Sequence, residues 1–201
     1  MGDTPVGGED GTAGSQAAGF DKNAELWNIL PDVGLGFAEL GSVTGRPCVG
    51  NPKPRLWRLP KSDALVVNYG LKNDGADQIS DRLRGLQFRI PIGISAAKTN
   101  ITETAEPDAA IDDYAHVAKR FQGMGDYLAL NVSCPNAFGG DQFTDSQLLD
   151  RLLSRIDSYT DKPVFLKIPA DLSESQTDAI LEVCGGHRVH GIVCSNLTKK
   201  R

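Results

Sequence analysis

The sequence predicts an α/β protein whose fold is an incomplete TIM (β/α)8 barrel, with about six of the eight β/α units present. Three observations lead to this prediction. Short apolar runs alternate with helical patterns, which is typical of parallel β/α units. Polar or charged residues follow each run; a barrel brings such residues to one rim, whereas a doubly wound sheet gathers them at a single switch point. Finally, 201 residues are too few for a typical barrel of about 250 residues.

Six apolar runs are expected to be the strands of this barrel. They cover residues 17–20, 36–44, 90–97, 127–130, 164–168 and 191–194. The residues at or just after their ends carry ammonium, hydroxyl or amide groups: Lys22, Ser42, Lys98, Asn131, Lys167 and Asn196. Because these residues belong to separate strands, we expect them to converge at the carboxyl ends of the strands, where barrels bind their ligands.

Five stretches show helical spacing and are expected to connect the strands: 24–30, 76–86, 107–121, 147–156 and 176–184. The first is expected to end at Pro31, and the third is the clearest amphipathic helix. Residues 46–60 contain four prolines and are expected to form a long excursion, since they suit neither a helix nor a central strand. Residues 1–16 are small, polar and glycine-rich, so a flexible tail is expected there, followed by the partial barrel at 17–201.

Composition argues against several classes of function. A formal net charge of −5 without a basic stripe argues against a nucleic-acid partner. The four cysteines form no C-x-x-C pair, so neither a disulfide framework nor a zinc knuckle is indicated, and a reducing cytosol fits best. His187 and His190 have no third ligand type nearby, so no metal site is expected. Membrane spans, signal peptides and the glycine-rich loops of Rossmann and P-loop folds have no counterpart in the sequence.

The stretch 128–140, LALNVSCPNAFGG, gathers reactive residues at one predicted strand end. Cys134 could be a nucleophile, a general base or an inert core residue, since free cysteine is often buried. Its place beyond the apolar part of the strand favours a functional role, because neighbouring cations would lower its pKa. Lys22, Lys98 and Lys167 are the candidates for that cation. Lys167 stands within an apolar strand and therefore needs a buried acceptor or an anion.

Five ordered motifs resemble those of the dihydroorotate dehydrogenases. They are AAGFDKN (17–23), GSVTGRPCVGNPKPRLWRLP (41–60), NVSCPN (131–136), VFLKIPADL (164–172) and CSNLT (194–198). The resemblance covers about residues 17–198, and GNPKPRLWRLP is particularly similar to the class 2, quinone-reducing branch. It implies an FMN-containing β/α barrel that oxidises dihydroorotate to orotate in pyrimidine synthesis, with a quinone as the electron acceptor.

The resemblance also implies roles for individual residues. Cys134 would be the base that takes a proton from C5 of dihydroorotate while C6 gives a hydride to flavin N5. The residues that would bind the substrate are Lys22, Asn68, Tyr69, Gly70, Asn131, Asn136 and Asn196. The residues that would contact FMN are Ala18, Gly19, Ser42, Ser95, Asn131 and Lys167. Such a set is physically coherent, because lysines offset the charge of a reduced flavin and amides match a planar ring bearing carbonyl and N–H groups.

The sequence departs from the family pattern at several positions. Class 2 enzymes usually carry serine at the position of Cys134, the asparagine of the third loop is displaced or lost at Asn68, and Ser95 stands where asparagine is common. The N-terminal segment that gives class 2 members their membrane contact is not recognisable, so a cytoplasmic or peripheral inner-membrane location is expected. The chain also stops before the loops that bind the FMN phosphate in this family. The alternative is therefore a non-catalytic partial barrel without the flavin phosphate site.

Overall fold

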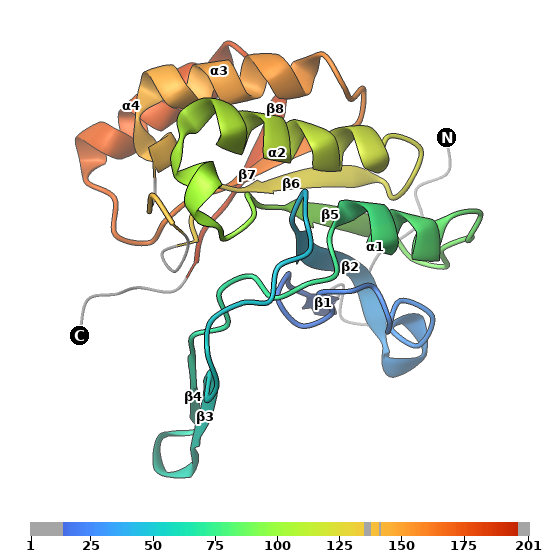
Figure 1. Ribbon diagram of the computed structural model, residues 1–201. Coiled ribbons are helices and arrows are strands. Elements are labelled where there is room, and N and C mark those ends of the chain that lie inside the picture. Colours follow the sequence, from blue (N-terminus) through green and yellow to red (C-terminus); the bar gives the residue numbers. More distant parts are fainter. Residues whose placement is uncertain (1–13, 135–137, 141, 197–201) are drawn as a thin grey trace.

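The computed structural model describes residues 14–134, 138–140 and 142–196, and its core is a parallel sheet that curls into part of a barrel (Figure 1). The described strands of this sheet are β1 (Gly14–Gln16), β2 (Leu35–Val43), β5 (Ile92–Ala96), β6 (Tyr127–Asn131), β7 (Val164–Lys167) and β8 (Val189–Val193). Their order is β1-β2-β5-β6-β7-β8, and every neighbouring pair is parallel. Because each strand lies beside the one that precedes it in this sheet, the winding is that of a barrel. The prediction of an incomplete (β/α)8 barrel is confirmed.

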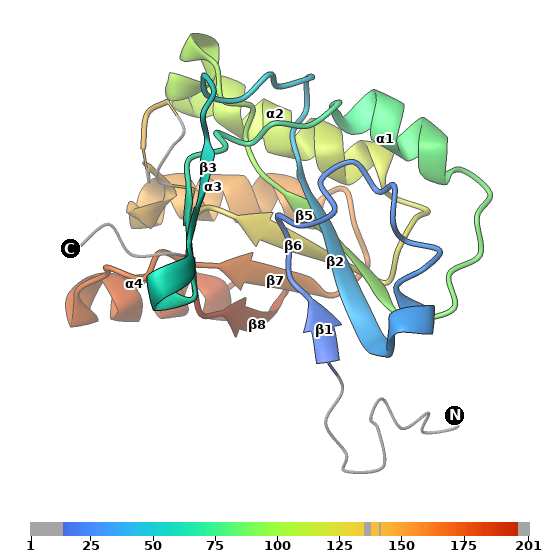
Figure 2. The same cartoon turned by 90° about the horizontal axis from the view of Figure 1, so that it is seen from below.

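The α-helices cover the convex face of the sheet (Figures 1 and 2). Within the described residues they are α1 (Ala76–Leu83), α2 (Pro107–Arg120), α3 (Ser146–Asp157) and α4 (Glu174–Gly185). The Asp145 carboxylate accepts hydrogen bonds from the first backbone N–H groups of α3, and Ser173 and Gln176 form a capping box at the start of α4. These helices confirm the predictions at 76–86, 107–121, 147–156 and 176–184, with ends that differ by up to three residues.

Alternation along the strands separates a buried face from an open one. Leu128 and Leu130 of β6, and Val164 and Leu166 of β7, are at most 4 % exposed, because they pack under the helices. Phe165 and Lys167 point the other way and are only half-buried. The concave face of the curled sheet is therefore open, and it carries the residues of the candidate site.

The beginning of the chain differs from the prediction in two ways. The first strand is Gly14–Gln16, so the strand expected at 17–20 is placed wrongly, and part of the expected tail belongs to the sheet. Residues 17–20 instead form a turn in which Gly19 has a φ of 109°. The helix expected at 24–30 is also wrong, because the Asp21 carboxylate accepts hydrogen bonds from the next backbone N–H groups and holds this stretch in turns. Pro31 then begins a 3-10 helix (η1, Pro31–Val33) instead of ending an α-helix.

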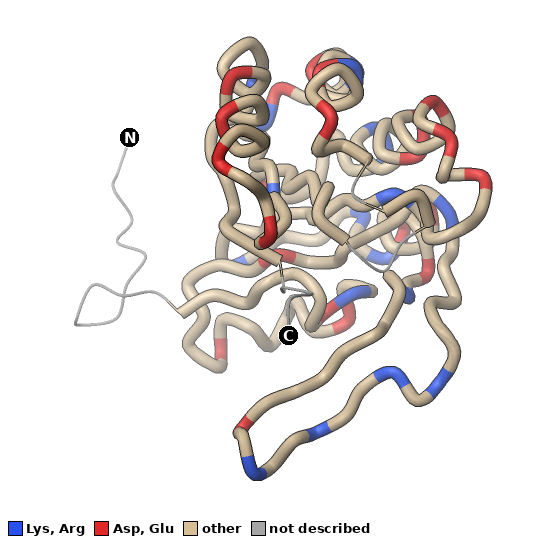
Figure 3. The backbone as a smooth tube through the Cα atoms, turned by 90° about the vertical axis from the view of Figure 1, so that its left-hand side faces the viewer, with Lys and Arg blue, Asp and Glu red and all other residues tan. Residues whose placement is uncertain are grey.

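The proline-rich excursion contains a hairpin that projects from the body (Figure 1). Its antiparallel strands are β3 (Leu56–Leu59) and β4 (Ala64–Val67), joined by a 3-10 helix, η2 (Pro60–Ser62). All eight strand residues are exposed, and lysine and arginine positions are spread along the hairpin and the segment before it (Figure 3). Two further 3-10 helices, η3 (Thr102–Ala105) and η4 (Gln142–Thr144), lie in the connections after β5 and β6. No described helix has the length and apolar character that a bilayer crossing needs.

Candidate active site

The polar residues predicted at the strand ends converge at the carboxyl end of the sheet. Ser42 lies near the end of β2, and Ser95 lies near the end of β5. Asn131 ends β6 and Lys167 ends β7, and the two residues are partners in the register of these strands. Asn196 follows β8 and is half-buried. Five neighbouring strands therefore contribute to one edge, as a barrel requires.

A chain of hydrogen bonds fixes the side chains at this edge. The hydroxyls of Ser42 and Ser95 lie 2.8 Å apart, and the Asn131 amide nitrogen donates to the Ser42 hydroxyl at 2.9 Å. The Asn131 amide oxygen accepts from the Ser133 hydroxyl at 2.9 Å, and the Asn196 amide donates to the Ser133 carbonyl at 2.8 Å. Because buried polar groups that satisfy one another lose their freedom to rotate, this chain makes a rigid polar edge.

Two cations and a thiol lie at the same end of the sheet. Lys22, in the loop after β1, is close enough to Cys134 and to Lys167 for their charges to interact. Desolvation lowers the pKa of Lys22; the charge of Cys134 opposes this shift, and the charge of Lys167 adds to it. The structure thus brings together three residues to which the resemblance assigns the chemistry, and their roles remain predictions.

Cys134 has a mixed environment. Its half-buried side chain packs against a small apolar cluster of Cys48, Leu71 and Ala97, while Lys22 interacts with it electrostatically. Apolar neighbours disfavour the thiolate and a cation favours it. In its thiolate form a cysteine in this position could take a proton from a ligand and become the neutral thiol, and the positive charge of the lysine would stabilise that thiolate.

The segment after β4 reaches the same region through Tyr69. The Tyr69 ring lies 5.3 Å from the Lys22 ammonium and 5.3 Å from the Arg55 guanidinium, so it bridges two cations. Asn68 is exposed, and its side-chain oxygen accepts a 2.8 Å hydrogen bond from the Asn51 amide. Tyr69 therefore adjoins the site directly, whereas the Asn68 amide is engaged with the proline-rich excursion.

Two asparagines that were not identified from the sequence complete this side. The Asn100 amide nitrogen donates to the Gly70 carbonyl at 3.3 Å and to the Asn51 side-chain oxygen at 3.4 Å. The Asn100 side-chain oxygen accepts from the Phe138 backbone N–H at 2.9 Å. These bonds join the loops after β2, β4, β5 and β6. The sequence signal was present, because Asn100 closely follows a strand end and Asn51 lies within the motif at 41–60.

Small residues form the turn that lies beside Lys22. The Gly19 N–H donates to the Gly41 carbonyl at 2.7 Å, which lays the turn after β1 along β2. A Cβ atom at Gly41 would lie 2.6 Å from the Ser95 carbonyl oxygen, and the φ of Gly41 is 116°, so only glycine fits there. Ala18 is half-buried and Gly19 is exposed, so the backbone of this turn is accessible to a flat ring beside Lys22.

Lys98 is the one candidate cation that the structure directs elsewhere. Its side chain is 4 % exposed, and its ammonium donates to the Thr104 carbonyl at 3.3 Å and to the Phe138 carbonyl. Its charge is therefore used to hold two loops.

Of the predicted site residues, Asn136 lies outside the described residues.

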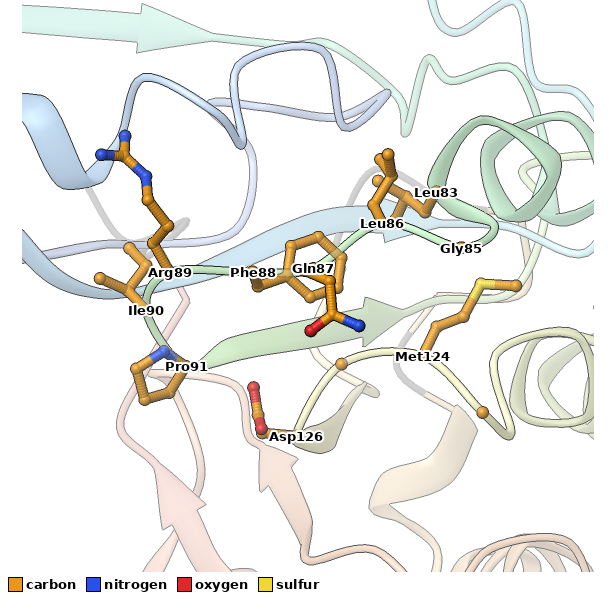
Figure 4. Close-up of a pocket in the computed structure, with 12 residues that line it drawn as sticks. Leu83, Gly85, Leu86, Gln87, Phe88, Arg89, Ile90, Pro91, Met124 and Asp126 are labelled. Carbon is orange, nitrogen blue, oxygen red and sulfur yellow. The ribbon is translucent and has the colours of Figure 1, made fainter.

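A wide cavity lies at the opposite end of the sheet (Figure 4). It has a volume of about 630 Å³ and is lined by Leu83 and residues 85–91 and 123–126, in the segments that lead into β5 and β6. The amino ends of barrel strands usually serve stability, so this cavity is a poor candidate for catalysis. In the described part of the chain, His, Cys, Asp and Glu side chains nowhere gather in threes that could hold a metal ion.

Comparison with known proteins matches the chain to one family. The family model described as dihydroorotate dehydrogenase matches residues 14–201. The dihydroorotate dehydrogenase (quinone) of Gloeobacter violaceus is 41 % identical over 187 residues, which are 92 % of this chain and 52 % of that protein. A protein of the same name from Thermus thermophilus is 39 % identical over 188 residues, which are 92 % of this chain and 54 % of the relative.

A solved structure shares the fold as well. The ligand-free DHODH of Eimeria tenella superimposes with a TM-score of 0.84 at 28 % identity, covering 95 % of this chain and 60 % of that one. The present chain therefore spans about half the length of the curated relatives it matches.

Proposed function

Because the chain belongs to the dihydroorotate dehydrogenase family, we propose that it carries the substrate-binding and flavin-facing side of an enzyme that oxidises dihydroorotate to orotate in pyrimidine synthesis. The observation that supports this most is the meeting of Lys22, Cys134 and Lys167 at one end of the sheet, next to the polar edge of Ser42 and Asn131. A base, two cations and amide groups on one rim suit proton removal from a flat, anionic substrate.

FMN fits the described residues on its ring side. Ala18 and Gly19 leave the backbone of the turn after β1 accessible, and the buried hydroxyls of Ser42 and Ser95 lie at the end of the sheet beside that turn. Lys167 would offset negative charge on the isoalloxazine ring. When bound, FMN would supply the hydride acceptor, which amino-acid side chains cannot provide. Phosphate sites of β/α barrels commonly follow strands 7 and 8, so the six strands described here would hold the ring and not the phosphate.

Each substrate-binding residue would have a distinct task. Lys22 would meet the carboxylate of dihydroorotate, and Tyr69 would keep that ammonium in place through its ring. Asn131 and Asn196, whose amides are already oriented through Ser133, would hydrogen-bond the ring carbonyl and N–H groups. Cys134 would then take the proton from C5. Asn68, Gly70 and Asn136 complete the set that the family resemblance implies.

The electron acceptor and the location of the protein follow from the relatives. Both bacterial relatives carry the name dihydroorotate dehydrogenase (quinone), which supports a quinone as the acceptor of electrons from FMN. A quinone is a membrane-dissolved oxidant, so the proposed location is cytoplasmic or peripheral at the inner membrane. Neither a nucleic acid nor a metal ion is part of the proposed activity.

A second candidate concerns the 201-residue chain by itself. In the described sheet β1 and β8 each have a single neighbouring strand, and the concave face is open. Open strand edges favour association with another chain. On its own, the chain would therefore behave as a non-catalytic partial barrel that lacks the flavin phosphate site.

One experiment separates these proposals. We define the barrel-completed protein as residues 1–196 of this chain joined to the C-terminal part of the Thermus thermophilus relative. That part begins immediately after the residue of the relative that aligns with Asn196. This protein should bind FMN, bleach when dihydroorotate is added without oxygen, and yield orotate. Lack of FMN binding by the correctly folded barrel-completed protein would refute the enzyme proposal. Bleaching of flavin by the 201-residue chain alone would refute the partial-barrel proposal.

A further inference from the structure

A carboxylate inside the barrel has no role in the function proposed above. Glu39 lies in the middle of β2 and is 8 % exposed. A buried carboxylate is costly unless partners compensate it, so the groups around Glu39 must supply that compensation.

The backbone register leads from Glu39 to Tyr127. Glu39 is opposite Gly93 of β5, and Gly93 is opposite Tyr127 of β6. A Cβ atom at Gly93 would lie 2.0 Å from the Tyr127 ring, so that ring crosses over the glycine. The Tyr127 hydroxyl is thereby directed toward β2, where it interacts electrostatically with the Glu39 carboxylate. Gly93 is therefore needed for a contact between two strands that are not adjacent.

The same face continues from Tyr127 to Lys167. The rings of Tyr127 and Phe165 meet edge to face, with centroids 5.1 Å apart, and Phe165 and Lys167 lie on the same side of β7. Burial raises the pKa of Glu39, while the positive charge of Lys167 and the Tyr127 hydroxyl oppose that shift. The carboxylate and the ammonium thus interact through space on the concave face.

We propose that Glu39 tunes the flavin site by balancing the charge of Lys167, which lies on the same concave face of the barrel. This inference rests on the proposed function. Without Glu39, Lys167 would present an unbalanced positive charge to the flavin ring. The reduced, more negative flavin would then be favoured.

The first test needs no cofactor. The Glu39 carboxyl is titrated by ¹³C NMR in the 201-residue chain, with and without the substitution Lys167→Met. The apparent pKa of Glu39 should rise in the variant, because the cation that lowers it is removed. The other groups that bear on this carboxyl are the Tyr127 hydroxyl and, through Tyr127, Asp126, and neither is altered. An unchanged titration would overturn the inference.

The second test measures the midpoint potential of FMN in the barrel-completed protein. Glu39→Gln should favour the reduced flavin about tenfold, which corresponds to a rise of about 30 mV for a two-electron couple. Tyr127→Phe should raise the potential by less, and Lys167→Met should lower it. Asp108→Asn removes one exposed carboxylate from α2 and should leave the potential unchanged.

The results of these tests distinguish a failure of this inference from a failure of the proposed enzyme function. If Lys167→Met lowers the potential and Glu39→Gln does not raise it, the role of Glu39 is refuted while the enzyme proposal stands. A change in melting temperature alone, without a change in potential, would show that Glu39 only stabilises the fold, and would also refute the inference. If the wild-type completed protein binds no FMN, the enzyme proposal fails, and the NMR titration still decides whether Glu39 and Lys167 interact.

Discussion

The side-chain amide of Asn131 donates a 2.9 Å hydrogen bond to the hydroxyl of Ser42, although 89 positions separate the two residues in the sequence. This bond spans the sheet from β6 to β2, across the end of β5, and Ser95 of β5 contacts the same hydroxyl at 2.8 Å. Ser42 is therefore an internal member of the polar edge, bonded to two partners, and Ser95 is a terminal member.

The internal position of Ser42 in this chain of hydrogen bonds predicts unequal effects of two similar substitutions. Ser42→Ala leaves the buried amide of Asn131 without its acceptor and should lower the free energy of unfolding by about 1–3 kcal/mol. Ser95→Ala leaves the bond between Ser42 and Asn131 intact and should cost only about 0.5–1.5 kcal/mol. Urea denaturation of the two variants, monitored by circular dichroism, measures the difference. Equal losses would show that the three side chains do not act as a chain.

A buried carboxylate on α2 ties together two loops that carry the site. Asp113 accepts hydrogen bonds from the Gly45 N–H at 3.1 Å and from the Thr99 N–H at 2.6 Å, and it also accepts from the Thr99 hydroxyl. Asp113→Asn should lower the free energy of unfolding by about 1.5–3 kcal/mol, because an amide offers one acceptor oxygen in place of two charged ones. Equilibrium unfolding in urea gives this value.

The neighbouring residue supplies the control. Asp112 is exposed and pairs with Arg155 at 3.3 Å, so Asp112→Asn removes the same charge one position earlier in the helix. Its effect should be about 0–1 kcal/mol, since exposed ion pairs contribute little. Similar losses for the two variants would mean that the charge on α2 matters, and not the loop contacts of Asp113.

The rim of the barrel could be predicted from the sequence because topology alone determines it. Once strands and helices alternate, the residues that follow each strand share one end of the sheet, whichever loops connect them. Ser42, Asn131 and Lys167 were located in this way.

The remaining features depend on contacts that a local pattern does not contain. The turns at 21–30 arise because Asp21 binds nearby backbone N–H groups in place of a helix, although the spacing of apolar residues there is helical. From the sequence, Lys98 was a candidate cation for the site, but in the structure its ammonium donates hydrogen bonds to the carbonyls of two loops. Glu39 resembles any charged strand residue, and only the register through Gly93 shows that it faces Tyr127.

An imidazole between two carboxylates predicts a dependence of stability on pH. His187, just after α4, places Nδ1 2.8 Å from Asp157 and Nε2 3.1 Å from Asp150, both on α3. Desolvation lowers the pKa of His187, but the two carboxylates outweigh it and the net pKa is raised. The folded state therefore binds the proton more tightly than the unfolded state, and the resulting stability is present below the ordinary pKa of about 6.5.

This contribution should disappear as pH rises through the raised pKa of the folded state. The free energy of unfolding, measured in urea from acidic to alkaline pH, should fall more steeply for the wild type than for His187→Gln. Asp157→Asn removes one of the two carboxylates and should give an intermediate slope. Parallel curves for the wild type and His187→Gln would contradict the prediction.

The proposed role of Cys134 leads to a kinetic prediction. In the barrel-completed protein, Cys134→Ala should slow the bleaching of FMN by dihydroorotate about 100-fold or more, because a general base typically contributes at least that factor. Single-turnover mixing without oxygen measures this step directly and separates it from reoxidation by a quinone. Cys184→Ala is the matched control, since this buried thiol lies on α4, on the convex side of the sheet, and its loss should affect stability but not the rate. Near-normal bleaching by Cys134→Ala would remove the thiol from proton transfer, and the base would then have to be sought elsewhere on the rim.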